Sequence, residues 1–126
     1  MQGDAAMHKI PHLYEFDKMP MEKLNDKISR RYIYGVNAMF VLFDLKKGAI
    51  IPDHHHESEQ ITYIIKGKVI VISEGKEFIV SKGEVLLIPP YAVHRFEALE
   101  DTHDIDVFAP IRKDWIEGTD NYLKEK

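Results

Sequence analysis

Three histidines and a glutamine have the spacing expected of metal ligands on β-structure. Side chains in a strand alternate between its two faces, so His54, His56 and Gln60 share one face and Glu59 points the other way. This alternation selects Gln60 rather than Glu59 as the third ligand. His94 is the expected fourth ligand, from a second stretch of the chain. Together the four side chains predict a metal site inside a small β-barrel.

These donors favour an open, reactive metal site over a closed structural one. Three imidazoles and an amide oxygen carry no charge, so a bound divalent ion would keep its positive charge and act as a strong Lewis acid. Imidazole nitrogen suits Ni, Zn, Mn and Fe, and four ligands leave one or two positions for water or substrate. We expect one divalent ion from this group. The alternative is that residues 54–56 form an exposed polar loop.

Glycines and a proline frame both ligand stretches, and this frame resembles the two motifs of the cupin family, G-x5-HxH-x3,4-E-x6-G and G-x5-PxG-x2-H-x3-N. The first motif is similar to the stretch from Gly48 to Gly67, and the second to the stretch from Gly83 to Ala98. The resemblance implies an all-β fold, an antiparallel double-stranded β-helix barrel with short flanking helical turns. Three positions depart from the motifs: Gln60 replaces Glu, Tyr91 replaces Gly and Ala98 replaces Asn.

Within the cupins, the Gln at the third ligand position resembles one branch in particular, the KdgF-like proteins of pectin and alginate degradation. Residues 106–115 resemble the D-x-F-x-P-x-R-x-D-[FW] tail of that branch, and residues 29–31 resemble its Ser-Arg-Lys segment. The resemblance implies that Asp106, Phe108 and Arg112 contact an acidic sugar. It also implies a reaction that opens the ring of a 4,5-unsaturated monouronate and gives a linear keto sugar.

Physical reasoning makes these three roles plausible and also supplies simpler ones. A carboxylate such as Asp106 on an apolar strand is costly unless it is paired or used, and it could take up a proton. The planar guanidinium of Arg112 suits the carboxylate of a uronic acid, and Phe108 could pack on a sugar face. Alternatively, Arg112 forms an ion pair with Asp114 or Asp106, and Phe108 is ordinary core.

Two other functions fit the same ligands. One is an oxygen-activating iron dioxygenase with three histidines, although the site lacks the carboxylate of the common facial triad. The other is a binding or sensing module without turnover, because a fold alone does not determine activity.

The segments that would position these residues are almost all strands. Short β-branched and aromatic runs begin near residues 32, 37, 60, 68, 76, 85, 94 and 104, and Gly and Pro turns separate them. Residues 19–26 are expected to form at most a short helical turn. A helix from Trp115 onward is weak, because Gly118 interrupts it. We expect a lead-in segment over residues 1–18 and a single barrel domain over residues 19–126.

Several strands are apolar on both faces, which indicates a second buried surface. On the strand that carries Gln60, the opposite face presents Ile61, Tyr63 and Ile65. We expect this face to form the interface of a homodimer. The alternative is that terminal segments of the same chain cover it.

Composition excludes several other classes. The chain of 126 residues has no cysteine, which rules out disulfides, Cys-bound zinc and thiol catalysis. A net charge of −4 and the lack of a basic stripe argue against nucleic acid, and the apolar runs are too short to span a membrane. The first residues lack the apolar centre of a secretory signal, so a cytoplasmic protein is expected.

Overall fold

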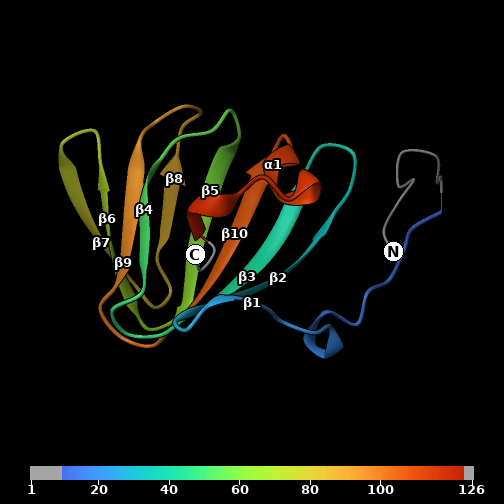
Figure 1. Ribbon diagram of the computed structural model, residues 1–126, viewed down its shortest axis with the longest axis horizontal. Helices are drawn as coiled ribbons and strands as arrows, with labels where there is room; N and C mark the ends of the chain where they lie inside the picture. Colours follow the sequence, from blue (N-terminus) through green and yellow to red (C-terminus); the bar gives the residue numbers. More distant parts are fainter. Residues whose placement is uncertain (1–9, 124–126) are drawn as a thin grey trace.

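Within residues 10–123, which the computed structural model describes, ten strands pair into two antiparallel sheets that face each other (Figure 1). The larger sheet has the order β1-β2-β3-β10-β5-β8, and the smaller sheet has the order β4-β9-β6-β7. The strands are β1 (Glu22–Asn25), β2 (Ile28–Tyr34), β3 (Met39–Leu45), β4 (Ile50–His54), β5 (Glu59–Lys66), β6 (Lys68–Ser73), β7 (Lys76–Ser81), β8 (Val85–Ile88), β9 (His94–Ala98) and β10 (Thr102–Ala109). The expected all-β, antiparallel barrel is confirmed.

Inward-facing side chains of the two sheets form the core. Much of it is apolar and close to fully buried, including Val41, Phe43, Ile64, Val69 and Val71. The central strand β10 departs from this pattern, because its inward side chains are Thr102, Asp104, Asp106 and Phe108, each at most 2% exposed. Two carboxyl groups therefore lie inside the barrel, where an ionised group is costly unless it is hydrogen-bonded or used.

Residues 54–60 do not form one strand, so the expectation of a shared strand face was wrong for this stretch. β4 ends at His54 in the smaller sheet and β5 begins at Glu59 in the larger sheet, because the chain crosses between the sheets here. Alternation does hold within β5, where Gln60 is buried and Glu59 is exposed. Gln60 therefore points inward through the alternation of β5 alone.

Residues 19–26 also differ from expectation. Instead of a helical turn, residues 22–25 form β1, which pairs with β2 through Glu22 opposite Arg30 and Lys23 opposite Ser29. Burial of Leu24, which is 5% exposed, stabilises this edge strand, whereas an isolated helix of this length is marginal in water. The helical turn of this region lies earlier, as the 3-10 helix η2 (Phe16–Lys18).

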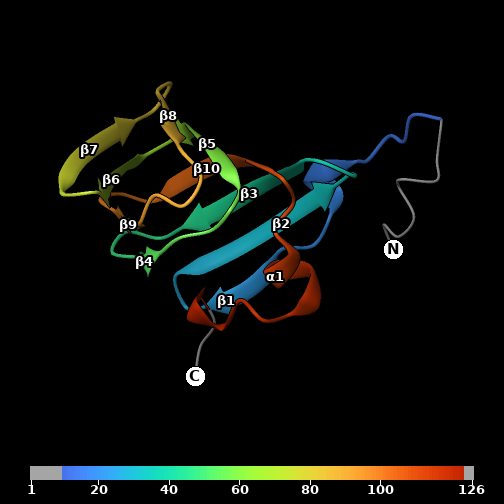
Figure 2. The same ribbon diagram turned by 90° about the horizontal axis from the view of Figure 1, so that it is seen from above.

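The C-terminal segment folds back over the inner face of β1–β3, which the smaller sheet does not cover (Figures 1 and 2). It contains helix α1 (Lys113–Glu117) and the 3-10 helix η3 (Asn121–Leu123). As expected, Gly118 ends the helix, and its φ of 75° is a left-handed conformation that favours glycine. Trp115 anchors the segment, with ring centroids 5.7 Å from Phe43 and 5.3 Å from Phe108.

The outer face of β5 and β8 in the larger sheet remains exposed in the described part of the chain. Ile61, Tyr63 and Ile65 point outward as expected and are 41%, 40% and 39% exposed. Leu87 and Val85 of β8 extend this apolar surface, because they pair with Ile61 and Tyr63. The C-terminal segment packs on the inner face instead, so it does not provide the alternative cover for these residues. No described helix is long and apolar enough to cross a membrane.

The described part of the lead-in extends away from the barrel (Figure 2). Leu13 is 92% exposed, whereas Phe16 contacts the barrel, where its ring meets the ring of Phe40 at 5.3 Å. Residues 1–9 of the predicted lead-in lie outside the described residues. The boundary at residue 18 stays a prediction.

Candidate metal centre

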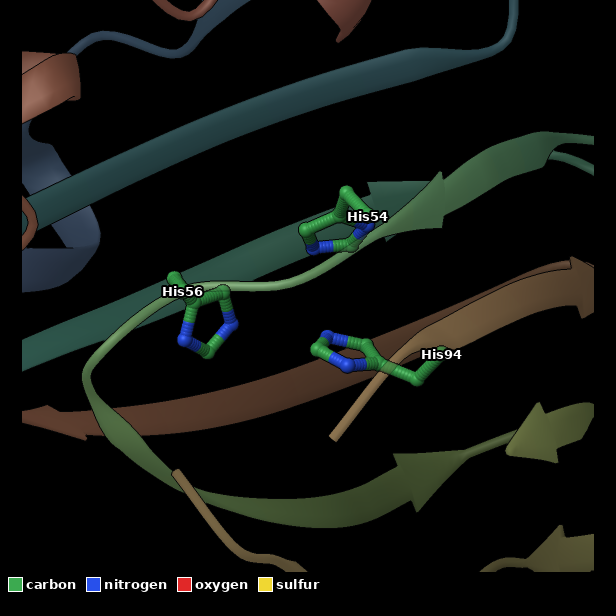
Figure 3. A group of neighbouring side chains, drawn as sticks. All are labelled: His54, His56 and His94. Atoms are coloured by element: carbon green, nitrogen blue, oxygen red, sulfur yellow. The ribbon is translucent and has the colours of Figure 1, made fainter. Parts of the chain in front are cut away.

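Three histidine rings point toward one another (Figure 3). His54 ends β4 and His94 begins β9, where the two residues are direct partners across the strands, and His56 lies in the loop after β4. The ring centroid of His54 lies 4.2 Å from that of His94 and 5.5 Å from that of His56. One ring nitrogen from each histidine lies within 4.8 Å of those of the other two. The cluster is therefore compatible with a metal ion.

Backbone carbonyls fix the orientation of all three rings. In each histidine Nδ1 lies 2.8–2.9 Å from the carbonyl oxygen of a nearby residue: Pro52 for His54, Ser58 for His56 and Ala92 for His94. A carbonyl oxygen only accepts hydrogen bonds, so the proton of each neutral ring sits on Nδ1. The Nε2 atoms are left with free lone pairs, which is the form that binds metal ions.

Of the three histidines, His94 most clearly has a ring nitrogen available for a metal ion. Its Nε2 atom is buried and has no hydrogen-bond partner among the described residues. Buried polar atoms are almost always paired, so an unpaired nitrogen next to two other imidazoles fits a metal ligand.

Gln60 adds an amide oxygen to the three imidazoles as a possible metal ligand. Its Nε2 donates to the hydroxyl of Thr62 at 3.0 Å, which turns its Oε1 toward His56, where it lies 3.1 Å from the ring Nε2. With the His56 proton on Nδ1, these two facing atoms are both acceptors. A cation between them would remove the repulsion. The residues present thus fit a divalent ion held by the three histidines and Gln60, and this ligand set stays a prediction.

The protonation of the histidines agrees with this arrangement. Burial, followed by the charges of His94 and Arg112, lowers the pKa of His54 from 6.5 to about 3. Burial and the charge of Arg112 lower the pKa of His56 to about 4, and burial also lowers the pKa of His94. All three rings are therefore neutral at pH 7 and have lone pairs available for a metal.

A buried carboxyl is connected to the predicted metal ligands. Asp106 accepts a hydrogen bond of 2.8 Å from the hydroxyl of Thr62, which itself accepts from Gln60. Burial raises the pKa of Asp106 to about 6, although bonds from Asp104, Thr62 and Gln60 oppose this rise. Burial and the neighbouring Asp106 raise the pKa of Asp104 well above its usual value. Two inward carboxyls with raised pKa values can hold and transfer a proton beside the site.

The guanidinium of Arg112 is buried beside the site but already engaged. Its Nε and one Nη donate to the two carboxylate oxygens of Asp114 at 3.0 and 2.8 Å, and the same Nη donates to the hydroxyl of Tyr122 at 2.7 Å. The alternative of an ion pair with Asp114 is therefore confirmed, whereas the ion pairs of the described residues do not include one between Arg112 and Asp106.

Phe108 belongs to the core and also borders the site. It is 2% exposed, its ring edge meets His56 with centroids 5.4 Å apart, and the Arg112 guanidinium lies 5.1 Å from its ring centre. Its contact with a sugar stays a prediction.

Tyr91, which stands where the cupin motif has Gly, has a left-handed backbone with φ of 66°. Glycine adopts this conformation at little cost, which explains the motif, and tyrosine adopts it with some strain. Its backbone N–H donates to the carbonyl of His56 at 2.8 Å. This turn therefore helps to hold the loop that carries a predicted ligand.

The structure adds three residues that sequence reasoning missed: Thr62, Asp104 and Tyr122. Thr62 and Asp104 could have been found, because each lies two positions from a predicted site residue on the same strand face. Tyr122 had no such signal, since only the fold-back of the C-terminal segment brings it to the site.

Comparison with known proteins agrees with the fold. Residues 41–108 match the model of the cupin domain family, so the chain belongs to the cupins. It is 33% identical over 103 residues to the pectin degradation protein KdgF of Dickeya dadantii, covering 79% of this chain and 94% of that protein.

Two solved structures illustrate the structural likeness. KdgF from Halomonas sp. superposes with a TM-score of 0.74 at 30% identity, covering 79% of this chain and 94% of that one. An RmlC-like cupin from Shewanella frigidimarina has a TM-score of 0.78 at 23% identity, covering 84% and 96%, and it supports the fold alone. The expected resemblance to the KdgF-like branch is confirmed.

Proposed function

We propose that this protein is a metal-dependent enzyme of uronate breakdown, which opens the ring of a 4,5-unsaturated monouronate. The observation that carries the proposal is the hydrogen-bonded chain from Gln60 through Thr62 to Asp106. This chain connects Gln60, whose amide oxygen faces the histidine cluster, to the buried carboxyl of Asp106, whose pKa is raised to about 6. The likeness to two KdgF proteins, one of them named for pectin degradation, supports the same substrate class.

The reaction is an isomerisation that needs no oxidant or second substrate. The bond between C1 and the ring oxygen breaks, and the C1 hydroxyl loses its proton to become a carbonyl. The ring oxygen leaves as an enolate on C5, and a proton added at C4 turns the enolate into a ketone. One proton leaves and one arrives, so a single acid–base group of suitable pKa can serve both steps.

Each proposed site residue then has a distinct task. A divalent ion held by His54, His56, Gln60 and His94 would polarise the sugar oxygens. Asp106 takes the proton from the C1 hydroxyl and returns it at C4. Arg112 attracts the substrate carboxylate, and Phe108 supports the His56 ring and packs against the sugar.

The decisive experiment combines metal analysis with an assay without oxygen. Purified protein should contain close to one divalent ion per chain, and it should convert an unsaturated monouronate under anaerobic conditions faster than a no-enzyme control. Turnover that requires oxygen would favour the three-histidine iron dioxygenase. Metal without turnover of any uronate would favour a binding module.

We also propose that the protein is a homodimer. The apolar outer face of Ile61, Tyr63 and Ile65 continues onto β8 through Val85 and Leu87, which are 59% and 58% exposed. Contiguous exposed apolar surface of this kind marks an interaction site, and a second copy would bury it symmetrically.

A further inference from the structure

The C-terminal strap, residues 118–123, lies directly over the histidine cluster. The ring of Tyr122 stacks on the ring of His54, with centroids 4.7 Å apart and an angle of 29° between the planes. Its hydroxyl accepts the 2.7 Å hydrogen bond from Arg112. One side chain of the strap thus contacts both a predicted metal ligand and a predicted sugar-binding residue.

The strap is fastened at sites away from the cluster. Asp120 and Arg30 form a buried ion pair of 2.7 Å, and the side chain of Asn25 donates to the carbonyl of Leu123 at 3.0 Å. These anchors lie to either side of Tyr122. The strap also lies beyond residues 41–108, the part of the chain that matches the cupin domain, so the family match assigns it no role.

The strap forms part of the wall of a small cavity beside two predicted ligands. Tyr122 and Leu123 line this cavity together with His54, Gln60 and Asp106. Its volume of about 10 Å³ is enough for roughly one water molecule. A sugar acid is many times larger, so it does not fit into this cavity, whose wall includes Tyr122.

We propose that the C-terminal strap is a lid that opens to admit the substrate, and that the Tyr122 hydroxyl occupies the place on Arg112 that a substrate oxygen takes. The inference rests on the proposed function for the identity of the substrate. The closed state competes with binding, so the measured affinity equals the affinity of the open form multiplied by the fraction of protein that is open.

The lid makes an unusual prediction for mutations. Replacing a residue that only forms the wall of a binding site weakens binding, whereas loosening a competing lid strengthens it. Tyr122→Ala removes one ring stack and one charge-assisted hydrogen bond, so we expect the open fraction to rise by about tenfold. Tyr122→Phe keeps the ring and loses only the hydroxyl, so we expect a smaller rise, of about threefold.

Two measurements on the metal-loaded protein test the lid. The first is the rate at which a chelator extracts Zn²⁺, which should be about tenfold faster for Tyr122→Ala, less so for Tyr122→Phe, and unchanged for Tyr14→Ala, a matched change in the lead-in. The second is calorimetric binding of galacturonate, a saturated monouronate that cannot ketonise. Its dissociation constant should fall by similar factors.

The two measurements separate failure of the lid from failure of the proposed function. Equal extraction rates for all variants, or weaker galacturonate binding in Tyr122→Ala, would overturn the lid. If no variant binds a uronate while chelator access still follows the predicted order, the lid is supported and the substrate class is wrong. Tyr122→Phe retains the ring that packs on His54, so it keeps the test valid should the alanine variant fail to fold.

Discussion

The Oε1 atom of Gln60 lies 3.1 Å from the Nε2 atom of His56, and with the His56 proton on Nδ1, facing the Ser58 carbonyl, both atoms are hydrogen-bond acceptors. Neither group can turn away freely, because the Gln60 amide is held by Thr62 and the His56 ring by the carbonyl of Ser58. A cation is the simplest partner for two acceptors fixed in this way, since a neutral imidazole offers no second proton. The pairing gives the predicted metal site a basis independent of family resemblance.

The first prediction concerns the metal ligands. His54→Ala and His94→Ala should each strip most of the bound metal, because each removes an Nε2 lone pair from the cluster. His55→Ala is the matched control, since His55 is exposed in the loop and lies outside the cluster. Elemental analysis of the purified variants checks this. Equal loss of metal in the His55 variant would show that the predicted ligand set is wrong.

The second prediction concerns the proton-transfer group. Asp106→Asn keeps the size of the side chain and its acceptor for Thr62 but removes its basicity. Metal content should stay at the wild-type level while turnover of an unsaturated uronate falls by about 10²–10⁴-fold, the usual range for a general acid or base. The assay needs a no-enzyme control, because such sugars also open slowly unaided. Near-normal turnover with metal bound would remove Asp106 from the mechanism.

The third prediction uses the raised pKa of Asp106, which is about 6 in the folded protein and near 4 when unfolded. Between these values the folded state binds more protons, so the contribution of this carboxyl to stability falls as the pH rises from about 4 to about 6. In metal-free protein, Asp106→Asn should therefore gain stability relative to wild type across this window. A shift of two units corresponds to at most about 3 kcal/mol.

Chemical denaturation at several pH values measures this difference directly. The three histidines also titrate, but they are common to both proteins and their effects cancel in the comparison. Asp104 adds to the difference in the same direction, because the Asp106→Asn change removes a neighbouring charge that raises the pKa of Asp104. A difference in the free energy of unfolding that stays constant from pH 4 to pH 7 would mean that Asp106 does not titrate in this range.

The fourth prediction concerns Arg112, whose guanidinium is bonded to both oxygens of Asp114. Arg112→Lys cannot reproduce this two-point contact in a buried position, so the free energy of unfolding should drop by about 2 kcal/mol and KM for the uronate should rise. Arg95→Lys, in a partly exposed pair with Glu97 at 3.7 Å, should cost less than about 0.5 kcal/mol. Equal melting temperatures for both variants would contradict the structural role.

The fifth prediction concerns assembly. Tyr63→Glu places a charge in the centre of the outer apolar face and should shift a dimer toward monomer, while metal content per chain persists. Ile79→Glu, an equally drastic change on β7 of the smaller sheet, should leave the assembly unchanged. Sedimentation velocity distinguishes the two. A wild-type protein that sediments as a monomer at every concentration would end the dimer proposal.

Much of the fold was predictable because its signals are local. Short apolar strands bounded by Gly and Pro turns predicted the barrel, and alternation along β5 correctly placed Gln60 inward and Tyr63 outward. The same rule failed between His54 and Gln60, because alternation carries information only within one strand and the chain changes sheets there. The histidines meet through the pairing of β4 with β9, which spacing alone does not specify.

The C-terminal strap could not be predicted for a different reason. Its position depends on contacts between residues far apart in the chain, such as Asp120 with Arg30 and Tyr122 with His54. Each of these side chains has an equally plausible exposed conformation when the sequence is read alone. The hydrogen bond from Arg112 to Tyr122 could not be predicted for the same reason.

The backbone carbonyls that orient the three imidazoles have an evolutionary consequence. When a side chain orients a ligand, a single substitution can remove it, but a carbonyl oxygen is present whatever residue occupies the position. Substitutions at Ala92, for example, leave the acceptor for His94 in place. The surroundings of the site can therefore drift in sequence while the geometry of the imidazoles persists.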